Sequence, residues 1–246
     1  MSPRRLGQHF LNDRNILRRI VDALEPAPGD VVLDIGAGKG SLTRELLGRG
    51  LRVIAVEKDR RLAADLECGM RNAECGIDEL SVVEGDALKL DWHALLDKAL
   101  TPPLPERVVF LVQEEVANRI TARPGTKVFG ALTVGVQALC RAEKLFVVRA
   151  GAFEPPPKVQ SALLRLVPLA EPLIDAATEG QAFRRFVTAC FSQRRKQLRN
   201  VLRAVTGKTA TEVTAGLTGL AIDPAARPET LAPAQFVALL HWRTSL

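Results

Sequence analysis

Residues 31–40 read VVLDIGAGKG, and this stretch decides the fold that the chain is expected to adopt. Its first five residues form an apolar run typical of a buried strand, and three glycines follow at alternate positions. Residues 41–47 then resume helical spacing through Leu42 and Leu46. A strand, a glycine-rich turn and a helix in this order are typical of the first unit of a doubly wound parallel sheet.

The same alternation continues outward from this stretch. The sequence predicts helices over residues 16–24, 113–122 and 129–139, strands over 52–57, 80–84 and 107–112, and β-rich runs over 144–148 and 163–167 that form an antiparallel closing pair. From about residue 171 onward the apolar period is helical. We therefore expect an α/β fold: a doubly wound, Rossmann-like sheet over residues 1–168 and a small all-helical domain over residues 169–246.

Composition and charge exclude several classes of protein. The 246 residues hold 34 Lys and Arg against 28 Asp and Glu, a net charge of +6, with 47% apolar residues, which is globular rather than disordered. No stretch approaches the roughly 20 apolar residues of a membrane span, so no membrane association is expected. Four scattered cysteines and three histidines predict neither a disulfide scaffold nor a metal site, and they fit a reducing cytoplasm.

The glycine turn is the first candidate binding site. Gly36, Gly38 and Gly40 can adopt positive φ and place no Cβ between the backbone and a ligand. The dinucleotide fingerprint has the spacing G-x-G-x-x-G, whereas here the third glycine comes one residue early and Ser41 takes its place. This spacing disfavours an NAD-dependent dehydrogenase, and the phosphate-loop spacing is absent too. A plain strand-to-helix turn without a ligand is the alternative.

Two acidic residues end later strands of the same sheet. Glu57 ends the second strand, 23 residues after Asp34, where its carboxylate can accept both ribose hydroxyl protons. Asp86 follows the third strand, where it can accept from the exocyclic amine of an adenine. Either acid alone could instead cap a helix. Together with the glycine turn, the two acids predict a cofactor that contains adenosine but no pyrophosphate.

Positive charge gathers in one interval of the C-terminal part. Between Glu179 and Glu212 there is no acid, and the interval carries Arg184, Arg185, Arg194, Arg195, Lys196, Arg199, Arg203 and Lys208. This surplus is a candidate phosphate-binding surface, with a solvated helix face as the alternative. The spacing of Arg195, Arg199 and Arg203 predicts that they share one helix face, while Leu198 and Leu202 face the core.

Several motifs resemble those of the KsgA-type ribosomal RNA adenine dimethyltransferases, and the resemblance covers nearly the whole chain. Residues 153–161, FEPPPKVQS, are the most specific of them, since no generic fold requires this string. Residues 7–11, GQHFL, look like the family's cofactor-closing motif, with His9 where Asn is commoner. Residues 191–200 and 219–229 are similar to its C-terminal domain and favour the small-subunit enzymes over the macrolide-resistance methylases.

The resemblance implies a cofactor and a set of site residues. S-adenosylmethionine is the implied cofactor, bound by His9, Leu11, Gly36, Gly38, Glu57 and Asp86. Phe153 is implied to stack on a target adenine that has left its own stack, so that its amine lies in line with the sulfonium methyl; a packing role is the alternative. With RNA as substrate, the residues expected to contact its phosphates are Arg194, Arg195, Lys196, Arg199 and Arg203.

One departure from the family concerns the catalytic loop. The family carries an Asn-Leu/Ile-Pro-Tyr motif after its fourth strand, but this sequence contains no Asn-x-Pro and no tyrosine. Roughly twenty residues, enough for a strand and its loop, are missing, with the break between Trp92 and Asp97. Either the natural protein carries an internal segment absent from this sequence, or the chain is a deletion that lost this loop. Losing a central strand would cost several kcal/mol of apolar burial, which favours the first reading.

Two functions follow from these observations. The first is an enzyme that uses S-adenosylmethionine to dimethylate adjacent adenines of small-subunit ribosomal RNA during ribosome biogenesis. In the family, the Asn and a backbone carbonyl accept the amine protons, and the Tyr supplies the second stacking face. The alternative is a catalytically impaired, RNA-binding ribosome-assembly factor, which the missing motif favours. The expected partner is small-subunit ribosomal RNA or a pre-ribosomal particle, and the chain is expected to be a cytoplasmic monomer.

Overall fold

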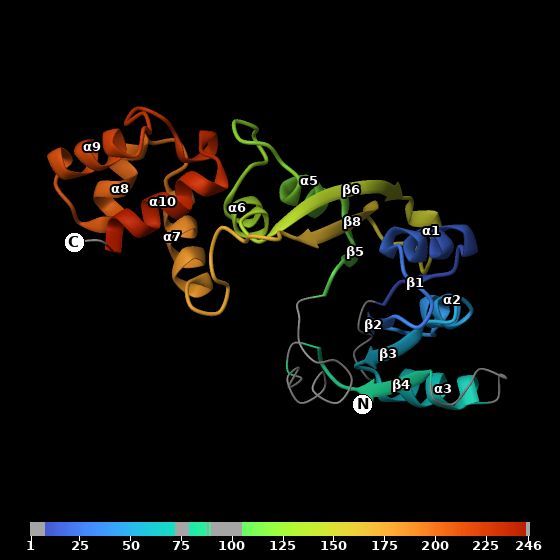
Figure 1. The fold of residues 1–246 in the computed structure, drawn as a ribbon. Helices are drawn as coiled ribbons and strands as arrows, with labels where there is room; N and C mark the ends of the chain where they lie inside the picture. Colours follow the sequence, from blue (N-terminus) through green and yellow to red (C-terminus); the bar gives the residue numbers. More distant parts are fainter. Residues whose placement is uncertain (1–7, 72–78, 88, 90–104, 245–246) are drawn as a thin grey trace, which may run out of the picture. The chain divides into compact units, whose positions relative to one another are not determined.

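The computed structural model describes residues 8–71, 79–87, 89 and 105–244 (Figure 1). The chain forms two compact units, one of residues 1–105 and 147–161 and the other of residues 106–146 and 162–246. The chain thus passes between the units three times instead of dividing once. The functional boundary between residues 168 and 169 stays a prediction.

The first unit holds the glycine turn. Its elements are β1 (Phe10–Leu11), α1 (Arg14–Leu24), β2 (Val31–Ile35), α2 (Ser41–Leu47), β3 (Arg52–Glu57), α3 (Arg60–Arg71), β4 (Leu80–Glu84), the 3-10 turn η1 (Ala150–Ala152) and β7 (Phe153–Glu154). The three predicted strands and the helix after the glycines are confirmed to the residue. Asp13 caps α1 by accepting from the amides of Asn15 and Ile16, at 2.9 and 3.2 Å.

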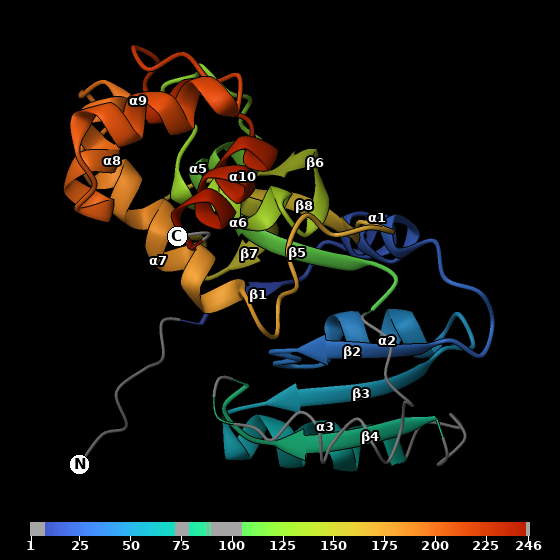
Figure 2. The ribbon, with the colours of Figure 1, turned by 60° about the vertical axis from the view of Figure 1, so that its left-hand side comes forward.

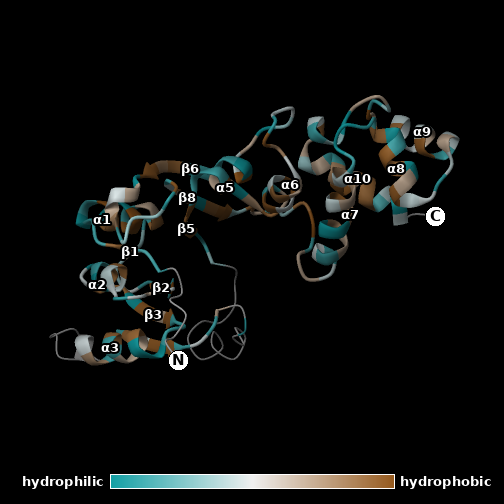
Figure 3. Ribbon diagram, turned by 180° about the vertical axis from the view of Figure 1, so that it is seen from behind, coloured by the Kyte–Doolittle hydropathy of each residue, from teal (hydrophilic) through white to brown (hydrophobic). Residues whose placement is uncertain are grey.

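Strands β2, β3 and β4 form a parallel sheet in that order, and Figure 2 shows the three running in one direction. Val53 of β3 lies opposite Val32 of β2 and Leu80 of β4. The central strand is buried over its last five residues, and in Figure 3 it is mostly coloured as hydrophobic. Side chains of α1, α2 and α3 complete the core of this unit: Val21, Leu46, Leu47 and Leu66 pack with Ala37, Leu51, Val53 and Ala55.

Strand β2 lies at the edge of this sheet, although its sequence predicts a buried strand. Ile35, its last residue, is 52% exposed. In a doubly wound sheet the strand order 3-2-1-4 places a fourth parallel strand beside the first. Among the described residues, β2 pairs with β3 alone, and the next strand along the chain, β5, pairs within a separate sheet. The first three parallel strands of the expected doubly wound sheet are therefore present, and the later strands β5, β8 and β6 form a sheet of their own.

The second unit combines a small sheet with a helical region. Its elements are β5 (Val108–Gln113), α5 (Glu114–Ile120), α6 (Ala131–Gln137), β6 (Cys140–Val148), β8 (Ser161–Pro168), α7 (Gly180–Ser192), α8 (Leu198–Thr206), α9 (Ala210–Gly219), the 3-10 turn η2 (Pro228–Thr230) and α10 (Pro233–Thr244). The sheet order is β5-β8-β6, and Figure 1 shows β6 and β8 running in opposite directions, as predicted. Strand β6 begins four residues before the expected start, and Glu143 in this extension pairs with Arg165 of β8 at 2.9 Å.

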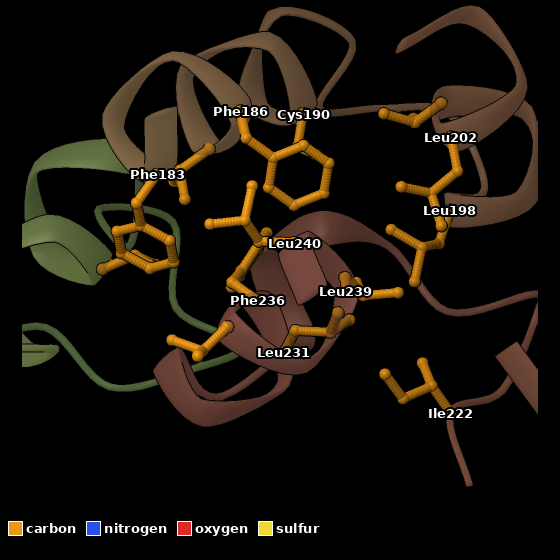
Figure 4. Packing of buried hydrophobic residues seen from close by; sticks show 14 of the residues in the cluster. Phe183, Phe186, Cys190, Leu198, Leu202, Ile222, Leu231, Phe236, Leu239 and Leu240 are labelled. Atoms are coloured by element: carbon orange, nitrogen blue, oxygen red, sulfur yellow. The ribbon is translucent and has the colours of Figure 1, made fainter. Parts of the chain in front are cut away.

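The helical region has a continuous apolar core, as its periodicity predicts. Phe183, Phe186 and Cys190 of α7 face Phe236, Leu239 and Leu240 of α10 (Figure 4). Leu198 and Leu202 of α8 are fully buried in the same cluster, which confirms the direction predicted for them. Within the described residues, no helix is both long and apolar enough to cross a membrane.

Candidate active site

The glycine turn has the backbone conformation that its sequence predicts. Gly36, Gly38 and Gly40 have φ of +81°, +57° and +74°, a left-handed region that side chains with a Cβ rarely adopt. The amides of Gly36 and Ala37 donate to the carbonyl of Val56, at 2.8 and 3.2 Å, and so fix the turn against the end of β3. A Cβ at Gly36 would meet no atom within 4 Å, so the turn has open space at this residue.

Glu57 lies directly at this turn. Its side chain is 5% exposed, with Oε2 accepting from the Gly38 amide at 2.7 Å and Oε1 from the Asp59 amide at 2.8 Å. A carboxylate offers about four acceptor positions, so two hydrogen bonds leave room for two more. Glu57 can therefore hold the turn and still accept from a pair of ribose hydroxyls.

A second buried carboxylate, Asp34, lies behind the turn and was not predicted as a functional residue. Thr43 of α2 donates its hydroxyl to Asp34 Oδ2 at 2.7 Å, and both side chains are buried. Burial raises the pKa of Asp34, the Thr43 hydrogen bond opposes that shift, and the nearby Glu57 charge adds to it. This hydrogen-bonded pair joins the end of β2 to the first turn of α2. The only sign of it in the sequence is that Asp34 is the one polar residue in an otherwise apolar strand.

Asp86 follows β4 at the same edge of the sheet as Glu57. The β3–β4 register places Glu57 opposite Glu84, two residues before Asp86. The Lys58 ammonium lies 2.9 Å from Asp86 Oδ2, an ion pair that the sequence pattern does not predict. The glycine turn, Glu57 and Asp86 thus stand at successive strand ends, as their order along the chain predicts.

The N-terminal motif lies against the segment that carries Phe153. Leu11 of β1 pairs with Phe153 of β7, and His9 Nδ1 is 2.6 Å from the carbonyl oxygen of Pro155. Phe153 is 9% exposed, so its ring is almost covered in this structure. The N-terminal motif, represented by His9 and Leu11, and the segment of Phe153 are therefore neighbours, although they are more than 140 residues apart in sequence. Both belong to the same unit as the glycine turn.

The basic residues of the second unit do not all lie where the spacing predicts. Arg199 and Arg203 are exposed on α8, but Arg195 and Lys196 belong to the turn before it, in which the Lys196 amide donates to the Gln193 carbonyl. The predicted face shared by Arg195, Arg199 and Arg203 is therefore wrong for Arg195, because the helix begins only at Leu198.

Arg194 differs from the other basic residues of the interval. Its guanidinium pairs with Glu229 and donates to the carbonyl of Thr126 at 3.1 Å. Both partners belong to the second unit, so this side chain fastens the end of α7 to η2 and to the turn before α6. Its predicted phosphate contact competes with this internal role.

The arrangement matches a known protein family. A family model described as Ribosomal RNA adenine dimethylase matches residues 2–101 and 93–244. The chain belongs to the ribosomal RNA adenine dimethylase family. The family model matches this chain in two separate segments, which overlap at residues 93–101. The predicted break between Trp92 and Asp97 falls where these two segments meet. Those residues lie outside the described part of the chain.

Curated relatives in the family include two that are called ribosomal RNA small subunit methyltransferase A. The protein of Acinetobacter baylyi is 42% identical over 262 positions, covering 96% of this chain and 90% of its own length. The protein of Pseudomonas aeruginosa is 37% identical, covering 97% and 93%. Since 96% of 246 residues is about 236, about 26 of the 262 positions lie opposite gaps in this chain. This number agrees with a missing segment of roughly the predicted length.

Solved structures show the same fold over nearly the whole chain. A dimethyladenosine transferase from Plasmodium falciparum is 26% identical with a TM-score of 0.76, covering 94% of this chain and 96% of that one. The 23S ribosomal RNA methyltransferase ErmE is 29% identical with a TM-score of 0.68, covering 95% and 98%. The predicted Rossmann-like fold with a helical C-terminal region is thus confirmed.

Proposed function

We propose that this protein transfers methyl groups from S-adenosylmethionine to the exocyclic amines of adjacent adenines in small-subunit ribosomal RNA. The main support for the proposal is that the glycine turn, Glu57 and the Phe153 segment lie in the same unit of a chain that belongs to this family. With ribosomal RNA as substrate, the protein would act in the cytoplasm, on small-subunit ribosomal RNA or on a pre-ribosomal particle. That the chain acts as a monomer stays a prediction.

The residues of the first unit fit an adenosine-containing methyl donor. Glu57 has acceptor positions for the two ribose hydroxyls, and Asp86, one strand farther on, would accept from the adenine amine. The open space at Gly36 lets the ligand approach the backbone closely. His9 and Leu11, held beside Phe153, would cover the bound cofactor. When bound, S-adenosylmethionine supplies an electrophilic methyl group on its sulfonium.

Phe153 would hold the target base. An adenine amine is a poor nucleophile because its lone pair is delocalised into the ring, so the base must be extruded and aligned. Stacking of a base on an aromatic ring contributes about 1–3 kcal/mol. The ring of Phe153 is nearly covered here, and it would exchange its present packing for the face of the base.

The experiment that tests the function is methyl transfer to unmethylated small-subunit ribosomal RNA, free or in ribosomal particles, with nucleosides identified by mass spectrometry. We expect N6,N6-dimethyladenosine at two adjacent positions. The curated relatives and the solved structures described above do not favour the assembly-factor alternative over the enzyme. Tight RNA binding without any methylated product, in a sample whose intact mass matches the full gene, would favour it.

Replacing Phe153 by Ala is expected to lower kcat/KM for RNA about 5- to 150-fold, the equivalent of 1–3 kcal/mol of lost stacking. Phe153→Trp keeps a flat ring and should retain most of the activity. Phe110→Ala, which removes the same side chain from an exposed position of β5, is the matched control and should change little. Equal losses in the Ala and Trp variants would show that Phe153 acts only by packing.

The exposed basic residues before and on α8 are proposed to bind phosphates. Replacing Arg195, Lys196 and Arg199 by Ala should weaken RNA binding and reduce the log–log salt slope by up to roughly 2–3. The cofactor affinity should not change, because the glycine turn lies in the other unit. Arg194 is left in place, since its loss is expected to lower the melting temperature by breaking the Glu229 pair.

Three exposed arginines of the first unit, Arg14, Arg52 and Arg61, provide a control with the same loss of positive charge. If both triple variants flatten the salt dependence equally, the effect comes from net charge alone. An unchanged slope in the α8 variant, with folding intact, would mean that these residues are a solvated surface.

A further inference from the structure

Phe10 in β1 contacts both the glycine turn and the segment that carries Phe153, the two parts of the proposed active site. On one side, its ring packs on the glycine turn: a Cβ at Gly38 would lie 3.3 Å from two of the ring carbons. The Lys39 ammonium lies 4.6 Å from the centre of the same ring, a cation–π distance. On the other side, the backbone of Phe10 pairs with Glu154, the residue after Phe153.

The short ladder between β1 and β7 is reinforced at both ends. His9 Nδ1 lies 2.6 Å from the Pro155 carbonyl oxygen, so the ring donates from this nitrogen. Asn12 donates its side-chain amide to Glu154 at 3.1 Å and its backbone amide to the carbonyl of Ala152 at 3.2 Å. Strand β1 is thus fixed to the segment around Phe153 by backbone and side-chain hydrogen bonds, so the two are expected to move together.

On the glycine-turn side, Phe10 makes only packing and cation–π contacts. Its ring has no group that can hydrogen-bond a ribose or an amine, so a direct role in holding either ligand is not expected. The absence of a Cβ at Gly38 lets the ring lie close to the backbone that the cofactor would approach. Any ligand that fixes the turn therefore also restricts where Phe10, and with it β1, can lie.

We propose that Phe10 is a positioning residue that couples cofactor binding at the glycine turn to the placement of Phe153 against the target adenine. The inference rests on the proposed function, because it takes the turn as the cofactor site and Phe153 as the base-holding residue. Coupling of this kind is reciprocal: the cofactor tightens RNA binding by the same factor by which RNA tightens cofactor binding.

The test is a binding cycle with S-adenosylhomocysteine and transcribed, unmethylated small-subunit ribosomal RNA. Each ligand is titrated with and without a saturating amount of the other. In the unchanged protein we expect a coupling factor in the range of about 5- to 150-fold that is typical of allosteric pairs. In Phe10→Ala the factor should fall close to one. Phe10→Tyr keeps the ring and should restore it, and Phe110→Ala should leave it unchanged.

A merely structural role of Phe10 would lower the melting temperature and weaken both ligands without abolishing the coupling. If Phe10→Ala does not fold, the comparison of Phe10→Leu with Phe10→Tyr takes its place, since Leu keeps apolar volume but not the flat ring. Coupling that persists in a folded Ala or Leu variant, or that is absent from the unchanged protein, would overturn the inference. Failure of the unchanged protein to bind S-adenosylhomocysteine at all would instead overturn the proposed function.

Discussion

A chimera that restores the missing segment is expected to methylate ribosomal RNA about 10²–10³-fold faster than the present chain. The segment is taken from the Acinetobacter baylyi relative, at the positions that correspond to the predicted break between Trp92 and Asp97. By the family resemblance it brings an Asn that accepts the amine protons and a Tyr that stacks on the base. Loss of one such oriented polar group costs an enzyme about this factor. The measurement is the single-turnover rate of methyl transfer at saturating cofactor.

The same chimera is expected to be more stable. Strand β2 is an edge strand with Ile35 52% exposed, and a further parallel strand beside it would bury this residue and its neighbours. Full burial of an aliphatic side chain contributes about 1.5–3 kcal/mol. For a chain of this size each kcal/mol raises the melting temperature by roughly 2–4 °C.

A Gly/Ser segment of equal length at the same position is the control, because it restores chain length without a strand or a catalytic residue. If the control gains as much stability as the chimera, the open edge of β2 is not where the segment acts. If the present chain already methylates at the rate of the chimera, the Asn-Leu/Ile-Pro-Tyr motif is unnecessary in this protein.

The local pattern was sufficient to predict the sheet around the glycine turn. Residues 31–35, 52–57 and 80–84 are short, largely apolar runs, and each forms a strand with those limits. Because the carboxyl ends of parallel strands share one edge, the order of Gly38, Glu57 and Asp86 was enough to bring them together. The missing Asn-Leu/Ile-Pro-Tyr segment already indicated that one strand of this sheet could be lost, and β2 is an edge strand in the structure.

A local turn and a few contacts between residues apart in sequence explain the remaining differences. Residues 195–203 keep a helical spacing, but the turn at Gln193–Lys196 delays α8 and removes Arg195 from its face. Arg194 looks like any other member of a basic run, and its structural role comes from Glu229 and Thr126, which are 35 and 68 residues away. Likewise, neither Asp34 nor Thr43 shows in sequence that the other is its hydrogen-bond partner. Periodicity reports which side of an element is buried, but not which polar groups meet.

Replacing Glu57 by Ala is expected to weaken S-adenosylmethionine binding by about 10²–10⁴-fold. Two hydrogen bonds from ribose hydroxyls to a charged acceptor contribute about 1.5–3 kcal/mol each, and every 1.4 kcal/mol is a factor of ten. The variant also leaves the amides of Gly38 and Asp59 without their present acceptor, so the melting temperature should fall as well. Calorimetric titration with the cofactor, together with thermal unfolding, measures both effects.

Two further variants separate the binding effect from the structural one. Glu57→Gln keeps the side-chain shape but replaces one acceptor oxygen by a donor, so its affinity should lie between those of the Ala variant and the unchanged protein. Glu84→Ala is the matched control: Glu84 lies opposite Glu57 in the β3–β4 register but is 54% exposed and pairs only weakly with Arg60. It should lose neither affinity nor stability. Unchanged cofactor affinity in a folded Glu57→Ala would show that this carboxylate holds only the glycine turn, and the ribose would have to be assigned to other groups.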